Sequence, residues 1–299
     1  MIPFHEPTIE DRAWARPILW ACGYPGAEYT FSSAYLWSGY YGRVAEVDGY
    51  LVQERVYGSE AVCIYPAGCC DVRGVLEKIL EDCRERHLTL AFQSLTDETR
   101  ADLERLYPGR FSYSPAQATY DYLYTVEALT ELRGKRLQAK RNHCNRFAAE
   151  NPGWYTVPIT AENIGLCCEV ERSWKADRDE AQAVESEDIA LGRAFEHFGE
   201  LEMDGLLLSD GTRFVAFSMG TRMNEQYYDV HFEKALPDSE GAYSVINREF
   251  SRMVAGKYPE LRYLNREDDM GLDGLRRAKE SYQPALVLKK YVADYLGVL

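Results

Sequence analysis

One short stretch in the second half of the chain collects side chains that can handle protons. Residues 227–234 (YYDVHFEK) read as a strand in which Asp229, His231 and Glu233 alternate with apolar residues. Side chains along a strand point to opposite faces in turn, so this spacing predicts all three titratable groups on one face. A histidine or a carboxylate can accept a proton from an amine or a hydroxyl during group transfer. The pattern indicates either the wall of a reaction cleft, with Glu233 or His231 as the catalytic base, or the solvent-facing side of an antiparallel sheet.

A second polar cluster follows the next expected strand, Leu261–Leu264, and precedes a helix. It consists of five consecutive residues: Asn265, Arg266, Glu267, Asp268 and Asp269. Acids at a helix start are favoured by the helix dipole, which is the simpler explanation. Five polar groups exceed what capping needs, however, and a carboxylate pair could hold a cationic amino group while the arginine binds a carboxylate or a phosphate. We expect Asp229 and the first four residues of the cluster to bind substrate. We also expect Arg266 and Glu267 to share one pocket with the polar face of the preceding strand.

The loop between these two segments, Pro237–Ala242, leads into a helix. Backbone N–H groups at a helix N-terminus can cradle a phosphate, which makes Ser239, Gly241 and Ala242 candidates for binding the pyrophosphate of coenzyme A. The loop has a single glycine and two acids, which weakens that interpretation. The alternative is a loop in which Ser239 or a neighbouring aspartate caps the helix.

A basic segment runs against the overall charge. Residues 132–149 contain no acid and six cations, which are Arg133, Lys135, Arg136, Lys140, Arg141 and Arg146. Such a helix could dock a phosphate-rich donor, with Lys140 and Arg141 as contacts, or an acidic lipid surface. It could equally be a solvated helix that pairs with the acidic remainder. The formal net charge of −14 opposes electrostatic binding of nucleic acid over a large surface, so the charge disfavours tRNA as a partner.

The elements that must position these groups repeat once along the chain. Each half reads as a meander of strands followed by a helix, a strand, a helix and a strand. This order predicts a duplicated α/β unit with a mixed, mostly antiparallel sheet, divided into residues 1–128 and residues 129–299. The second unit then carries the candidate site.

Composition and the N-terminal sequence indicate the general class of the protein, its location and its metal content. The 46% hydrophobic content of the 299 residues is typical of a globular chain with a full core. The start, MIPFHEPTIEDR, lacks the features of a signal peptide, so a cytoplasmic location is expected. Eight cysteines occur without CxxC or Cys/His zinc spacing, which predicts buried reduced thiols and no bound metal.

Several strings resemble the C-terminal catalytic domain of the lysylphosphatidylglycerol synthases. They are LRGKRLQAKRNHCNRF at 132–147, VAFSMG at 215–220, VHFEKA at 230–235 and the run from Asn265 to Tyr282. The resemblance covers the second half well and the first half loosely, through Tyr29–Tyr41. That family has a tandem GCN5-related N-acyltransferase (GNAT) fold and is related to the Fem-type peptidyltransferases, which use aminoacyl-tRNA.

The resemblance implies two tandem GNAT-like units. It also implies transfer of an acyl or aminoacyl group to an amine or a hydroxyl, such as a phosphatidylglycerol-like acceptor, from a coenzyme A thioester or an aminoacyl-tRNA. No tightly bound cofactor is expected. The membrane enzymes carry a multi-helix region ahead of this domain, whereas no apolar run here reaches the ~18–20 residues of a membrane span, so any membrane contact would be peripheral. The alternative is a non-catalytic module that binds an amino-acid-like or phosphorylated ligand.

Overall fold

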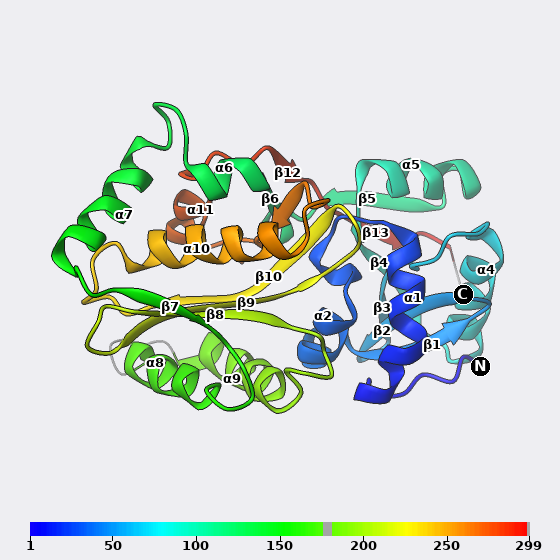
Figure 1. Cartoon of the computed structure of the whole chain (residues 1–299). Helices are drawn as coiled ribbons and strands as arrows, with labels where there is room; N and C mark the ends of the chain where they lie inside the picture. Colours follow the sequence, from blue (N-terminus) through cyan, green and yellow to red (C-terminus); the bar gives the residue numbers. More distant parts are fainter. Residues whose placement is uncertain (176–180, 298–299) are drawn as a thin grey trace. The chain divides into compact units, whose positions relative to one another are not determined.

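The chain forms two compact α/β units, each built on one mixed sheet (Figure 1). The computed structural model describes residues 1–175 and 181–297, without the side chains of residues 181–185. The first unit comprises Met1–Asp121, Asp268–Asp273 and Val287–Leu299, and the second comprises Tyr122–Glu267 and Gly274–Leu286. These bounds depart from the expected division at residue 128, because later segments of the chain return to the first unit. The expected fold class, α/β in two units with mixed sheets, is confirmed.

The sheet of the first unit has six strands in the order β1-β2-β3-β4-β13-β5. Its strands are β1 (Arg43–Val47), β2 (Tyr50–Tyr57), β3 (Glu60–Ile64), β4 (Thr89–Leu95), β5 (Phe111–Pro115) and β13 (Tyr291–Tyr295). Only the β3–β4 pair is parallel, because α4 provides the crossover between these two strands. The helices of this unit are α1 (Arg12–Cys22), α2 (Phe31–Leu36), α3 (Ser38–Tyr41), α4 (Arg73–Glu85) and α5 (Asp97–Leu106).

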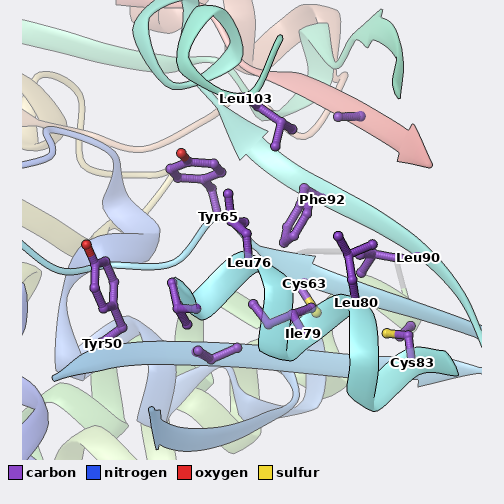
Figure 2. Packing of buried hydrophobic residues seen from close by; sticks show 14 of the residues in the cluster. Tyr50, Cys63, Tyr65, Leu76, Ile79, Leu80, Cys83, Leu90, Phe92 and Leu103 are labelled. Atoms are coloured by element: carbon purple, nitrogen blue, oxygen red, sulfur yellow. The ribbon is translucent and has the colours of Figure 1, made fainter. Parts of the chain in front are cut away.

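Helix α4 supplies much of the core of the first unit. Val75, Leu76, Ile79 and Cys83 recur at helical spacing, and all four are buried. Figure 2 shows this face of α4 lying over strands that contribute Cys63 and Phe92, among others. The spacing of these four residues therefore marks the face of α4 that packs against the sheet.

The sheet of the second unit has seven strands in the order β12-β6-β11-β10-β9-β8-β7. Its strands are β6 (Asp121–Thr125), β7 (Tyr155–Pro158), β8 (Asp204–Ser209), β9 (Phe214–Arg222), β10 (Tyr227–Ala235), β11 (Tyr263–Asn265) and β12 (Leu286–Leu288). The parallel pair here is β10–β11, joined by α10. The helices are α6 (Val126–Glu131), α7 (Gln138–Glu150), α8 (Gly165–Lys175), α9 (Ala181–Glu196), α10 (Ala242–Lys257) and α11 (Asp273–Glu280).

Helices cover both faces of this second sheet. Helix α10 lies on one face, where Phe250 meets Tyr228 with ring centroids 5.9 Å apart. Helices α8 and α9 lie on the other face, where Phe195 meets Phe217 with centroids 6.4 Å apart (Figure 1). A polar side chain in the middle of this sheet is consequently buried on either face and needs partners.

The two sheets exchange one strand each. β6, the last strand of the first half, lies between β11 and β12 in the second sheet. β13, the last strand of the second half, lies between β4 and β5 in the first sheet. β12, which directly precedes β13 in sequence, stays in the second sheet, so β6 and β13 are the strands that join the sheet of the other half.

Candidate functional site

A β-bulge in β10 decides where its polar side chains point. Val230 pairs with Gly220 and Phe232 pairs with Met219, so His231 is an extra residue with no partner of its own in β9. Alternation restarts after the bulge, which puts Glu233 on the α10 face while Asp229 and His231 remain on the α8/α9 face. The prediction that all three share one face is therefore wrong.

Glu233 and Arg266 form the polar centre on the α10 face. Arg266 Nη2 lies 2.6 Å from Glu233 Oε1, and both side chains are only 7% exposed. Asn247 of α10 donates to Glu233 Oε2 at 3.0 Å. The parallel β10–β11 pair brings these groups together, because the C-terminal ends of neighbouring parallel strands meet at one edge. The expected proximity of this strand end to residue 266 is confirmed.

Three tyrosines surround the Arg266 guanidinium. Its central carbon lies 5.5 Å from the ring centre of Tyr124, 5.9 Å from that of Tyr243 and 4.8 Å from that of Tyr282. Burial raises the pKa of Tyr282 to about 12, so this phenol stays neutral. Burial alone would lower the pKa of Arg266, but the neighbouring Glu233 charge raises it above its ordinary value. The guanidinium is a permanent cation over aromatic faces.

One end of this guanidinium has no partner. Arg266 Nη1 is buried and meets no hydrogen-bond acceptor within the described part of the chain. Nη2, by contrast, contacts both Glu233 and the Tyr243 hydroxyl, the latter at 3.3 Å. A buried donor without an acceptor is costly, which indicates a place for an oxygen of a bound molecule. Tyr243 is 39% exposed as a residue, but burial of its hydroxyl raises the pKa of this phenol.

A second cation lies beside this centre. The Lys140 ammonium is 4.1 Å from the ring centre of Tyr282. Burial, with a contribution from Arg266, lowers the pKa of Lys140 below its ordinary value. Lys140 forms no ion pair with any residue that the structure describes. Lys140 and Arg266 together outnumber the single carboxylate of Glu233, so the centre favours an anionic or carbonyl oxygen.

The other face carries a separate cluster around His231. Its Nε2 lies 2.7 Å from Thr221 Oγ1, and its Nδ1 lies 3.2 Å from Glu267 Oε1 and 3.5 Å from Asp229 Oδ2. The side chains of His231 and Asp229 are fully buried, and that of Glu267 is 26% exposed. Glu233 and Glu267 therefore lie on opposite faces, and the predicted pocket shared by Arg266 and Glu267 is wrong.

The rest of the 265–269 cluster shapes the backbone. Asn265 Oδ1 accepts the Glu267 N–H at 2.8 Å, and Glu267 adopts a left-handed conformation with φ of 56°. Asp268 belongs to the first unit, where its carboxylate accepts the Met270 N–H at 3.0 Å. Asn265 and Asp268 thus each accept a backbone N–H in the segment that follows β11.

The candidate phosphate loop is closely packed by protein. Gly241 has φ of +85°, and a Cβ there would lie 2.6 Å from the His143 carbonyl oxygen of α7. Ser239 and Ala242 are joined by a backbone hydrogen bond of 3.1 Å in the same turn. The acids of the loop pair with arginines, Asp238 with Arg213 at 2.7 Å and Glu240 with Arg146 at 2.6 Å. The glycine therefore allows close approach of α7.

The basic segment is only partly helical. The expected helix at 132–150 begins at Gln138, because Leu132 ends α6 in a left-handed conformation and residues 133–137 form a turn. Arg141 holds this turn by donating Nη1 to the carbonyls of Leu132 and Gly134, the latter at 2.8 Å. Arg141 is thus engaged with the protein backbone, while Lys135 and Arg136 are exposed.

The sequence did not point to the three tyrosines around Arg266, to Asn247 or to Thr221. The chain has 22 tyrosines, and nothing local marks Tyr124 and Tyr282 as neighbours. The α10 spacing could have found Asn247, since Tyr243 and Asn247 are one helical turn apart.

No helix among the described residues is long and apolar enough to cross a membrane.

Comparison with known proteins identifies the family. The family model described as phosphatidylglycerol lysyltransferase, C-terminal, matches residues 23–294. A conserved protein of unknown function from Bacteroides thetaiotaomicron is 34% identical, with a TM-score of 0.92 over 99% of this chain and 100% of that chain. L-PGS from Bacillus licheniformis is 17% identical, with a TM-score of 0.71 over 99% of this chain and 94% of that chain, which shows a shared fold.

A curated relative, the uncharacterized protein MYCGA3080 of Mycoplasmoides gallisepticum, is 25% identical over 184 residues. That match covers 60% of this chain and 58% of the relative. The family match spans most of the chain and confirms the resemblance seen in the sequence. The chain belongs to the family of the phosphatidylglycerol lysyltransferase C-terminal domain.

Proposed function

We propose that this protein is an aminoacyl- or acyltransferase whose reaction centre is the Glu233–Arg266 pair. Family membership supports transferase chemistry, since the family is described by lysyl transfer to phosphatidylglycerol. The acceptor is an amine or a hydroxyl, and a phosphatidylglycerol-like headgroup is the first candidate. The donor is an aminoacyl-tRNA or a coenzyme A thioester.

The observation that carries the proposal is the buried Arg266 Nη1, which lacks an acceptor among the described residues. A carbonyl oxygen of the transferred group placed there would satisfy this donor. The same N–H would stabilise the negative charge that develops on that oxygen during attack by the acceptor. Because the guanidinium is fixed by Glu233 and three rings, little reorganisation is needed.

Glu233 is assigned the role of base. Its carboxylate already accepts hydrogen bonds from Arg266 and Asn247 and is also bonded to Tyr243. A carboxylate has about four acceptor positions, so one remains for the acceptor. An amine or hydroxyl bound to Glu233 would lie beside the carbonyl held by Arg266, as attack requires. His231 is left out of this step, because it lies on the opposite face and both ring nitrogens already have partners.

Aminoacyl transfer to lipid vesicles tests the proposal. Purified protein would be given labelled aminoacyl-tRNA in one series and labelled acetyl coenzyme A in another, with phosphatidylglycerol vesicles or free amines as acceptors. Arg266→Lys should reduce kcat by about 100-fold or more, as expected for loss of one such donor. Glu233→Gln should show a loss of similar size.

Arg222→Lys is the matched control. Arg222 is in the same sheet, pairs with Glu260 and lies 4.7 Å from the ring centre of Tyr258. Transfer should be unchanged in this variant. Equal losses in Arg266→Lys and Arg222→Lys would argue against a specific role for Arg266.

Binding without transfer is the second candidate. The packing of α7 against Gly241 and the pairing of both loop acids favour it, because they leave the usual phosphate-binding loop little room. A ligand that raises the unfolding free energy by about 2.7 kcal/mol at 100 times its Kd, with no turnover in any donor series, would support this candidate.

A further inference from the structure

We propose that Asp229, His231 and Glu267 form a divalent-cation site on the α8/α9 face of the second sheet. The site is separate from the Glu233–Arg266 centre, which faces α10. It also differs from the expectation of no bound metal, which was drawn from cysteine spacing.

The distances between the donor atoms suit a common metal ion. His231 Nδ1 lies 3.2 Å from Glu267 Oε1 and 3.5 Å from Asp229 Oδ2, and all three donor atoms lie within 4.8 Å of one another. Two ligands that are each about 2.1 Å from one ion lie about 3.0–3.5 Å apart in octahedral or tetrahedral geometry. Small side-chain movements would therefore bring all three atoms to one ion.

Charge favours a cation at this point. Two carboxylates face one imidazole nitrogen, and His231 and Asp229 have fully buried side chains. Burying like charges together is costly unless a positive centre lies between them. A proton on Nδ1 could bond Glu267, but at 3.5 Å it would bond Asp229 poorly. A divalent cation would bind both carboxylates at once.

The surroundings orient the imidazole as in metal sites. Thr221 Oγ1 lies 2.7 Å from His231 Nε2 and can accept its N–H, which leaves the Nδ1 lone pair directed at the carboxylates. The bulge places His231 at this position, because it inserts the residue opposite β9 without a ladder partner. Glu267 reaches the cluster from a left-handed backbone position, a conformation that is uncommon outside glycine.

The donor set indicates the kind of ion. One nitrogen and two carboxylates suit Mn²⁺, Fe²⁺ or Zn²⁺ better than a soft ion. Glu267 is the partly exposed member, so remaining coordination positions would open on its side to water or to an oxygen ligand.

Mn²⁺ binding by the full-length chain is the test. Mn²⁺ is chosen because Cys69 and Cys70 are exposed thiols that would complicate a zinc titration. After treatment with a chelator, protein would be titrated with Mn²⁺, and the free ion would be counted by electron paramagnetic resonance. We expect one Mn²⁺ per chain, and a rise in Tm when Mn²⁺ is present.

Three variants and one control sharpen the result. Glu267→Gln and His231→Gln should weaken binding by about 100-fold, and Thr221→Val by about tenfold, as seen for residues that orient metal ligands. His143→Gln, which removes an exposed imidazole from α7, should bind as the wild type does. Circular dichroism would verify folding. If His231→Gln does not fold, the partly exposed Glu267→Gln decides the question.

Two outcomes would overturn the site. One is the absence of stoichiometric Mn²⁺ binding at millimolar concentration, which would mean that these three side chains do not hold a divalent cation. The other is wild-type Mn²⁺ affinity in folded Glu267→Gln, which would place any bound ion elsewhere.

Discussion

A glutamate–arginine pair with a buried carboxylate lies next to the sheet in each unit, and the two arginines bind their carboxylates differently. In the first unit Arg86 donates Nη1 to Glu54 Oε1 at 2.6 Å and Nη2 to Glu54 Oε2 at 2.9 Å. Arg43 Nη2 also donates to Glu54 Oε2 at 2.8 Å. In the second unit Arg266 contacts Glu233 through Nη2 alone, and its Nη1 meets no acceptor among the described residues. We call the first pair closed, because both carboxylate oxygens contact Arg86, and the second pair open, because Arg266 keeps one N–H group without an acceptor in the part of the chain that the structure describes. A closed pair stabilises the fold, whereas an open pair can still bind a ligand.

The strands before the crossover helices also differ between the two units, in the regularity of their pairing. β2 and β3 pair in unbroken register from Glu54–Cys63 to Tyr57–Glu60. β10, which has the equivalent place before the crossover helix in the second sheet, contains the bulge at His231. One inserted residue gives the second sheet polar groups on both faces, while β3 contributes Ala61 and Cys63 to an apolar core.

Breaking the closed pair should have the largest effect on stability. Arg86→Met leaves Glu54, which is 1% exposed, with Arg43 as its remaining arginine partner. We expect the unfolding free energy to fall by about 3 kcal/mol, as for a broken buried ion pair. Urea denaturation would measure this, with the exposed Arg84→Met as control, for which a change within about 0.5 kcal/mol is expected. A loss below 1 kcal/mol in Arg86→Met would contradict the role of a brace.

Disturbing the bulge should have the next largest effect. A Cβ on Gly220 would lie 2.1 Å from the Asp229 carbonyl oxygen, which the backbone cannot easily relieve. Gly220→Ala should therefore cost about 2–3 kcal/mol in thermal or urea unfolding. Gly192→Ala in α9, where a Cβ meets open space, should instead be stabilising by up to about 1 kcal/mol. Similar values for both variants would show that the bulge tolerates rearrangement.

Replacing arginine by lysine in each unit compares the two pairs directly. Arg86→Lys loses the two-point contact with Glu54 and should cost about 1.5 kcal/mol of stability while leaving transfer unchanged. Arg266→Lys should show the reverse, a loss of transfer with a smaller change in stability. Measuring the unfolding free energy and the transfer rate of both variants tests the comparison. If both variants lose stability and transfer to the same extent, the two pairs do not differ in role.

The smallest effect concerns the pH dependence of stability. Burial and Arg266 lower the pKa of Lys140 below its ordinary value of 10.5, so the unfolded chain binds this proton more tightly. Stability should rise as the pH increases toward 10.5, and Lys140→Met should flatten that rise. Urea unfolding between pH 7 and pH 10 would measure it, with exposed Lys135→Met as control. An unchanged slope in Lys140→Met would mean that the ammonium is well solvated.

The sequence predicted the elements better than their polar contacts. The spacing of Val75, Leu76 and Ile79 defines α4, and the crossover at 242–257 brings the end of β10 next to Arg266. The bulge could not be predicted, because Val230, His231 and Phe232 continue the same alternation that a regular strand would have. Its effect on Glu233 depends on pairing with β9, which is a tertiary property.

Long-range neighbours were also beyond local reasoning. Tyr124 and Tyr282 meet at Arg266 only because β6 joins the second sheet beside β11. Periodicity placed β6 in the first half, where its residues lie in sequence. The packing of α7 against Gly241 could not be predicted for the same reason. A glycine at this position is equally compatible with a phosphate-binding loop and with close packing of another helix.

The exchange of strands has a consequence for how the chain acquires its structure. β13 is an interior strand of the first sheet, hydrogen-bonded to β4 and β5 on its two sides. That sheet cannot close until residues 291–295 have left the ribosome, although its other five strands are complete by residue 115. Until then β4 and β5 expose unpaired edges, which are prone to association with other chains. Contacts of such large sequence separation also slow folding, so we expect the first sheet to be completed only after β13 is available.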